Sequence, residues 1–210
     1  MTHRSLRRTG GLAALALTAT LGLAACSDDS GATTASGSGA SSRSADSAMD
    51  AGADTFGPGC AAVPTSGAGS FDGMATEPVA SAASANPLLK TLVSAVGQAG
   101  LVDTLNSADG ITVFAPADDA FKQIPKKDLK AVLSDKDTLT KVLTYHVIDG
   151  QLPPDQLAGT HKTLEGQELT IKGSGEDFTV GAGGAKVLCG NIPTANATVY
   201  VIDSVLMPPA

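Results

Sequence analysis

The chain has 210 residues, which allows one or two domains. Tryptophan is absent and aromatic residues make up only 3% of the sequence, so a core must consist mainly of Leu, Val, Ile and Ala. The formal charge is −7, and it becomes −10 without residues 1–25, because that segment has three arginines and no acid. An acidic chain without a basic stripe repels phosphate groups. This argues against nucleic-acid binding and against attachment to anionic lipid by charge alone.

Residues 1–25 have the three parts of an export signal. Three arginines form a basic start, and the apolar run that follows from residue 11 to residue 23 is too short for a comfortable membrane span. The run ends in Leu-Ala-Ala-Cys, which resembles the bacterial lipobox, so we expect Cys26 to carry a lipid anchor in the membrane. The alternative is an ordinary signal peptide with an incidental cysteine, and the paired arginines leave the export route open.

Residues 26–55 consist mostly of Ser, Gly, Ala, Thr and Asp, with almost nothing to bury. This composition predicts a disordered tether that lets a domain stand away from the membrane. Its hydroxyl residues either carry O-linked sugar or form an unmodified spacer. Residues 56–74 are expected to be an N-terminal extension of the domain, with ordered structure beginning at Phe56.

The chain has three cysteines. If Cys26 is lipidated, Cys60 and Cys189 remain as a pair in an oxidising compartment, and we expect a disulfide between them. Such a bond would close a loop of about 130 residues and stabilise the fold by about 5 kcal/mol at best. The alternative is two free buried thiols. Two cysteines without a nearby histidine cluster do not predict a zinc site.

Helical patterns dominate the first half of the domain. Pro78 suits the first position of a helix, and a second apolar stripe with helical spacing ends at Gly100. Residues 126–133 are amphipathic, and their lysines predict a solvated helix face rather than a binding patch. Asp135 stands at the start of a further helical pattern, where an acid favours the helix dipole. The second stripe consists of Leu88, Leu89, Leu92, Val93 and Val96.

Residues 111–121 predict a strand-to-helix corner. The alternation of apolar residues around Thr112 suits a half-buried strand, which should stop at Pro116 because proline lacks a donor N–H. Asp118 is expected to cap the short helix that follows. Phe121 would then turn inward beside Phe114.

The second half predicts antiparallel hairpins, because short strand-like segments alternate with glycine-rich turns. In the last segment Val199 and Val201 face one way, and Tyr200 and Ile202 the other. His146 stands alone in the apolar run 143–148. We interpret it as a core histidine with both nitrogens satisfied rather than a ligand or catalytic group.

Three of these segments together resemble the signatures of fasciclin (FAS1) domains. They are the Thr-Val-Phe-Ala-Pro corner, the Tyr145-His146 element and the terminal Val-Ile-Asp-Ser-Val-Leu-Met-Pro run. The family usually has a hydroxyl residue where this chain has Ala117. The resemblance covers residues 75–208 and implies an α+β fold, a fasciclin-like antiparallel β-wedge or sandwich with several packed helices. The tether and lipobox resemble those of actinobacterial surface lipoproteins in this family.

The resemblance also implies a function. In animal members the Tyr-His element has been linked to integrin binding, which marks Tyr145 and His146 as candidate partner-binding residues, although their inward orientation argues against direct contact. We find no motif for nucleophilic, metal-dependent or phosphate chemistry, and we expect no cofactor. The prediction is a lipid-anchored, non-enzymatic surface module that contacts a protein or cell-envelope partner. The alternative is a surface lipoprotein that binds a small molecule between helices and sheet, and an enzyme is the least favoured reading.

Overall fold

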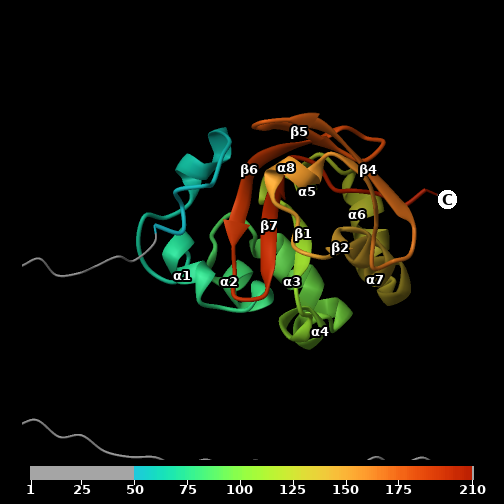
Figure 1. The fold of residues 1–210 in the computed structure, drawn as a ribbon. Coiled ribbons are helices and arrows are strands. Elements are labelled where there is room, and N and C mark those ends of the chain that lie inside the picture. Colours follow the sequence, from blue (N-terminus) through green and yellow to red (C-terminus); the bar gives the residue numbers. More distant parts are fainter. Residues whose placement is uncertain (1–49, 210) are drawn as a thin grey trace, which may run out of the picture. The chain divides into compact units, whose positions relative to one another are not determined.

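The computed structural model describes residues 50–209, drawn in colour in Figure 1. The predicted signal peptide, Cys26 and most of the predicted tether lie outside the described residues. The predicted tether includes residues 50–55, yet they form a turn in which the Ala53 amide donates to the Asp50 carbonyl at 2.9 Å. The Ala51 amide also donates to Asp72 Oδ1 at 3.0 Å. The predicted boundary at residue 55 is therefore too late, because hydrogen bonds to the domain order this polar segment.

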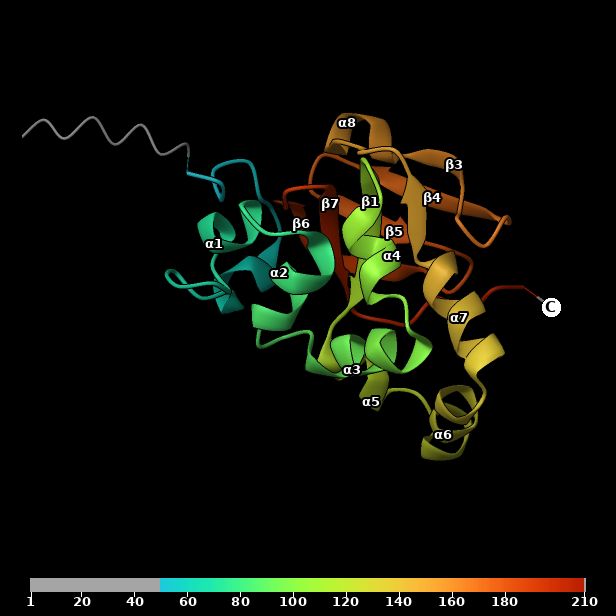
Figure 2. The ribbon, with the colours of Figure 1, turned by 90° about the horizontal axis from the view of Figure 1, so that it is seen from below.

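The helices are short, and most of them lie on one side of a single sheet (Figures 1 and 2). Gly100, with φ of 74°, ends the third helix as predicted. Asp135 lies at the start of the seventh as predicted, and the structure adds that it caps this helix through the Asp137 and Thr138 amides. The helices are the 3₁₀ turn η1 (Pro58–Ala62), α1 (Phe71–Ala75), α2 (Val79–Ala85), α3 (Lys90–Ala99), α4 (Val102–Ser107), α5 (Asp118–Lys122), α6 (Lys126–Ser134), α7 (Lys136–Tyr145) and α8 (Pro154–Leu157).

The strands of residues 50–209 form one seven-stranded sheet in the order β2-β1-β7-β6-β5-β4-β3. They are β1 (Ile111–Pro116), β2 (Val147–Asp149), β3 (Gly159–Lys162), β4 (Glu168–Ser174), β5 (Asp177–Val180), β6 (Ala185–Pro193) and β7 (Ala197–Ile202). The fold is α+β, as predicted. The sheet is mixed rather than purely antiparallel, because β1 and β7 pair in parallel. Its two edges meet where the Leu164 amide donates to the Val147 carbonyl at 2.8 Å, so the sheet nearly closes on itself.

Two apolar clusters lie on opposite faces of this sheet. The helix-side cluster joins α1, α2, α3, α5 and α7 to the strands and consists mainly of Val, Leu and Ala. The inner cluster fills the curl of the sheet and contains Phe56, Phe114, Tyr145, Phe178 and Tyr200. The predicted alternation in β7 is confirmed, because Val199 and Val201 belong to the first cluster and Tyr200 and Ile202 to the second.

The first strand differs from its prediction. All six residues of β1 are buried, because helices cover one face and the curled sheet covers the other. Thr112 tolerates this position because its hydroxyl donates to the Gly150 carbonyl at 2.7 Å and accepts from the Leu152 amide at 2.8 Å. The expected half-buried strand is thus a central strand with a satisfied polar residue.

The corner after β1 also differs in two respects. Phe114 lies in the inner cluster and Phe121 in the helix-side cluster, so the two rings lie on opposite faces of the sheet rather than side by side. Asp118 does not cap its own helix, since the capping position of α5 is Ala117 and has no side-chain bond. Instead Asp118 Oδ1 accepts from the Thr91 amide at 2.8 Å, in the first turn of α3.

Candidate functional site

His146 follows α7 at the end of the predicted partner-binding element. The ring is only 2% exposed, and its Nδ1 lies 2.7 Å from the Val142 carbonyl. Its Nε2 accepts from the Leu206 amide at 2.9 Å. Because that amide can only donate, Nε2 is unprotonated and Nδ1 carries the hydrogen. Burial lowers the pKa of His146 from 6.5 to about 4, so the ring is neutral at pH 7. The prediction of a core histidine with both nitrogens satisfied is confirmed.

Tyr145 packs into the inner cluster and is 5% exposed. Its hydroxyl donates to the Glu168 carbonyl over 3.4 Å, a long and weak contact. Burial raises the pKa of this phenol, so it stays protonated near neutral pH. Both candidate residues therefore lie largely beneath the surface. A molecule approaching this element from solvent would first meet the side chains around Tyr145 and His146.

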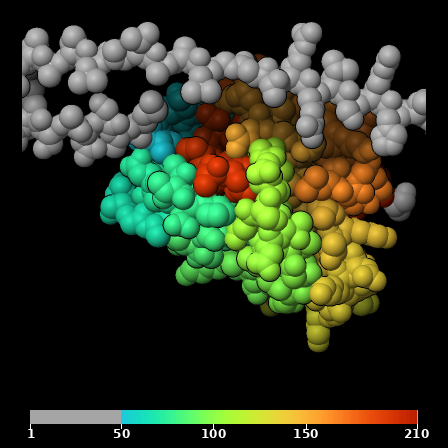
Figure 3. Space-filling view, turned by 60° about the horizontal axis from the view of Figure 1, so that its bottom comes forward, coloured from blue at the N-terminus to red at the C-terminus, as the bar shows by residue number. Residues whose placement is uncertain are grey.

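An apolar groove lies directly over His146 on the helix side. Its walls come from α2, α3, α4, β1 and the α7–β2 connection, with Leu164 at one edge, and it encloses a cavity of about 60 Å³. In Figure 3 the green α4 stands in the middle of this face, with the teal α2 on one side and the yellow α7 on the other. Residues that define the groove include Val79, Leu92, Val102, Val113, Val147 and Leu164.

Polar side chains of the inner wall are hydrogen-bonded to backbone groups. The Thr144 hydroxyl donates to the Thr140 carbonyl of its own helix at 2.8 Å, and both nitrogens of His146 are bonded to backbone. The cavity wall is therefore almost wholly apolar. A group entering it gains contact with hydrocarbon and finds few hydrogen-bonding partners.

The mouth of the groove has exposed apolar side chains. Within residues 50–209, the exposed large apolar side chains are Val102 at 37%, Leu164 at 44% and Met207 at 49%. The first two line the groove. They come from segments about 60 positions apart in the chain, and their meeting point could not be inferred from periodicity. Neither residue is among the predicted partner-binding residues.

Asn196, in the turn between β6 and β7, braces two walls of the groove. Its Nδ2 donates to the Leu105 carbonyl at 2.8 Å and to the Ala108 carbonyl at 2.7 Å. Its Oδ1 accepts from the Val79 amide at 2.9 Å. One side chain thus holds the end of α4 and the start of α2, both on the helix side of the sheet in Figure 2.

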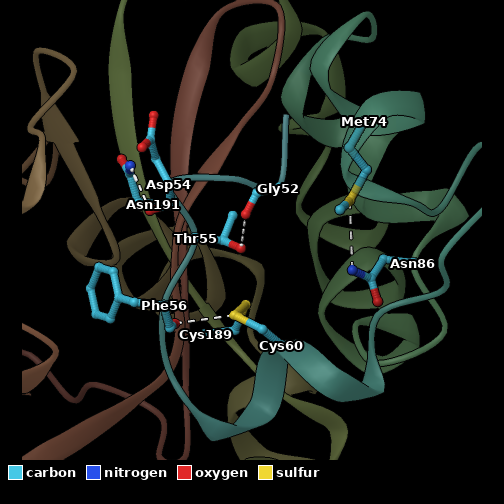
Figure 4. The surroundings of a disulfide bond; sticks show 9 residues. All are labelled: Gly52, Asp54, Thr55, Phe56, Cys60, Met74, Asn86, Cys189 and Asn191. Carbon is cyan, nitrogen blue, oxygen red and sulfur yellow. Dashed lines mark hydrogen bonds between the residues drawn. A yellow bond between two sulfur atoms is a disulfide. The ribbon is translucent and has the colours of Figure 1, made fainter. Parts of the chain in front are cut away.

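The structure joins Cys60 to Cys189, which confirms the predicted disulfide (Figure 4). The bond links η1 to β6, and Phe56 four residues earlier reaches into the inner cluster. Within the described part of the chain, no group of three or more His, Cys, Asp and Glu residues could hold a metal ion. Among helices of residues 50–209, none has the length and apolar character needed to span a membrane.

Comparison with known proteins identifies the family. A family model described as the fasciclin domain matches residues 87–208, within the predicted range 75–208. The chain is 48% identical over 169 residues to the cell surface glycolipoprotein MPT83 of Mycobacterium tuberculosis, covering 77% of this chain and 76% of that protein.

Two further proteins are similar to this chain. It is 48% identical over 165 residues to the immunogenic protein MPB70 of Mycobacterium bovis, covering 75% of this chain and 84% of that protein. A solved FAS1 domain pair from the insect cell adhesion molecule fasciclin I is 23% identical, with a TM-score of 0.48, over 57% of this chain and 45% of that one. The family match and the identity to MPT83 and MPB70 together lead to one conclusion: the chain belongs to the fasciclin domain family.

Proposed function

We propose that this protein is a non-enzymatic surface module that is anchored by a lipid on Cys26 and binds a protein partner through its apolar groove. The name of MPT83, a cell surface glycolipoprotein, supports the surface location. The Leu-Ala-Ala-Cys run supports the anchor. An intact mass of the exported protein with a diacylglyceryl group on Cys26 is the expected result, and an unmodified thiol there would remove the anchor from the proposal.

One observation supports this binding site most directly. Two of the three large apolar side chains exposed in residues 50–209, Val102 and Leu164, flank the same cavity. Exposed apolar residues scattered singly need no explanation, whereas two of them beside one recess support a binding surface there. A cavity of about 60 Å³ with few polar groups suits one bulky apolar side chain of a partner, the usual anchor of a protein interface.

Paired variants test this site. Val102→Asp and Leu164→Asp place a charge at the mouth of the groove, and each should weaken retention of the partner from extracellular and cell-envelope proteins at least ten-fold. Met207→Asp is the matched control, because Met207 is the third exposed large apolar residue and does not line the groove. Retention that falls equally in all three variants, or in none, contradicts the groove as the binding site.

We assign His146 no catalytic role. Its two nitrogens are engaged with the Val142 carbonyl and the Leu206 amide, so it can take up a proton only by losing the second bond. Structural roles also explain the carboxylates noted in the sequence, since Asp118 caps α3 and Asp119 pairs with Lys122 at the surface. Turnover that disappears when one polar side chain is replaced would contradict a non-enzymatic function.

The cavity also favours a second candidate, a small apolar molecule bound in the same groove. Its apolar wall fits such a ligand, although few polar groups converge to orient it. Native mass spectrometry of the purified protein separates the two candidates. A bound mass that disappears in Leu164→Asp, with no protein retained by the parent, would replace the partner proposal with this one.

A further inference from the structure

The N-terminal segment is attached to the middle of the sheet at one site. The Phe56 amide donates to the Gly190 carbonyl at 3.3 Å, and the Gly190 amide donates back to the Phe56 carbonyl at 2.8 Å. Asn191 Nδ2 donates to the Asp54 carbonyl at 3.1 Å, and the Cys60–Cys189 bond closes the same site (Figure 4). All these contacts fall on β6, the fourth of seven strands.

The ring of Phe56 packs against the backbone of Gly190. A Cβ at Gly190 would lie only 2.4 Å from this ring, so no larger residue fits there without a shift. The ring centroid lies 5.8 Å from that of Phe178 and 6.3 Å from that of Tyr200. The N-terminal segment therefore contributes an aromatic side chain to the inner cluster, beside the disulfide.

The chain beyond Cys60 leads to the groove through two short helices. Helices α1 and α2 have five and seven residues, lengths that are unstable without tertiary contacts. Val79, Ala80 and Ala83 of α2 form a groove wall, and the Ala80 amide donates to Asn106 Oδ1 of α4 at 2.9 Å. Unravelling from the N-terminal end would therefore dismantle the groove once it passed α1.

We propose that the Cys60–Cys189 bond is a mechanical stop, which prevents a pull on the N-terminal end from unravelling the wall of the groove. A load that enters at Asp50 can extend the chain only as far as Cys60, where the covalent bond transfers it to β6. Residue 60 lies before α1 and α2, so both helices stay in place. This role goes beyond partner binding, and its test needs no partner.

Single-molecule pulling tests the stop. Handles are placed at the N-terminus of the full chain and at Lys162, an exposed residue of β3, with Cys26→Ser in every arm to prevent mispairing. The disulfide-bonded protein should show no long extension before the domain unfolds. The Cys60→Ser/Cys189→Ser variant should show an early, low-force lengthening of up to roughly 140 Å, which is the reach of the chain between Asp50 and the start of α3.

Two further arms keep the test decisive. Adding a reductant to the folded, held protein should produce the same early step, which covers the case in which the double variant does not fold. Phe56→Ala keeps the disulfide and should lengthen by no more than roughly 35 Å, the reach from Asp50 to Cys60. An early step in the bonded protein well beyond the roughly 35 Å reach to Cys60 overturns the proposal, as does the absence of a longer step after reduction.

Discussion

The two faces of the sheet bury apolar side chains in different ways. Five of the seven aromatic residues of the chain lie in the inner cluster, together with Leu157, Leu169 and Val180, which are completely buried. The helix-side cluster consists mainly of Val, Leu and Ala. Cavities of about 60, 20 and 30 Å³ are lined mainly by residues of the helix-side cluster. These three small cavities lie on the face with the smaller side chains.

Element length gives a physical reason for this difference. The strands of the curl are joined by hydrogen bonds along their length, so their inward side chains converge on one closed volume. Several helices on the other face are only five to seven residues long and meet the sheet with few side chains each. Short helices cannot interdigitate over several turns, so recesses remain between them. The candidate binding groove is one of these recesses.

The same Leu→Ala substitution on each face of the sheet tests this difference in packing. Leu169→Ala in the inner cluster should lower the free energy of unfolding by about 4–5 kcal/mol, and Leu92→Ala beside the groove by about 2–3 kcal/mol. The reason is that Leu169 is fully enclosed, whereas Leu92 already borders open space. Chemical unfolding measures both values. Equal losses would show that the helix side is packed as tightly as the inner side.

Acid should weaken the hydrogen bond by which His146, beside the groove, is joined to the inner cluster. His146 borders the groove and bonds to Leu206, a member of the inner cluster. Its pKa is about 4 in the folded state and near 6.5 when unfolded, so the unfolded state binds the proton first as the pH falls. The stabilisation is complete above pH 6.5 and is lost progressively toward pH 4. Between pH 7 and pH 4.5 this group should cost about 2–3 kcal/mol.

Unfolding by urea across this pH range measures the effect. In His146→Gln the loss between pH 7 and pH 4.5 should shrink by that amount, because the titrating group is gone. The parent protein, measured in parallel, supplies the reference pH dependence. An unchanged slope in His146→Gln would assign the acid sensitivity to other groups.

On the helix side, single polar contacts position short helices. Removing one of these contacts should have a smaller effect on stability. Asp118→Ala removes the acceptor of the Thr91 amide in the first turn of α3, whose own capping residue Leu89 has no side-chain bond. The expected loss is about 1 kcal/mol in thermal or chemical unfolding. Asp119→Ala is the neighbouring control, since its partner Lys122 is exposed, and its stability should stay near that of the parent. Equal effects would mean that Asp118 acts only as a local charge.

Several sequence expectations depended on nearby residues and are confirmed for that reason. Gly100 ends α3 because it adopts a left-handed conformation, and Asp135 lies at the start of α7, where its carboxylate also reaches the next amides. The two-residue period placed Tyr200 and Ile202 on one face of β7. His146 is buried because apolar residues surround it in the sequence as well as in space.

Other features depended on residues far apart and escaped the sequence analysis. The acceptor oxygen of Asp118 lies near its own helix in sequence, yet it binds an amide 27 positions away, because β1 delivers it to the start of α3. Phe114 and Phe121 are seven positions apart but lie on opposite faces of the sheet. No local sequence pattern specifies on which face of a sheet the chain continues after a turn.

The sequence by itself determined the family and the α+β class, because both depend on residue types at characteristic spacings. It also indicated the disulfide, as the pair that remains beside Cys26, and the buried histidine, from the apolar run around it. Tertiary structure alone decided the parallel pairing of β1 with β7 and the meeting of Val102 with Leu164 at one cavity. These depend on how the sheet curls and where the short helices come to rest on it. Local periodicity specifies which face of an element is apolar, and only packing specifies what that face meets.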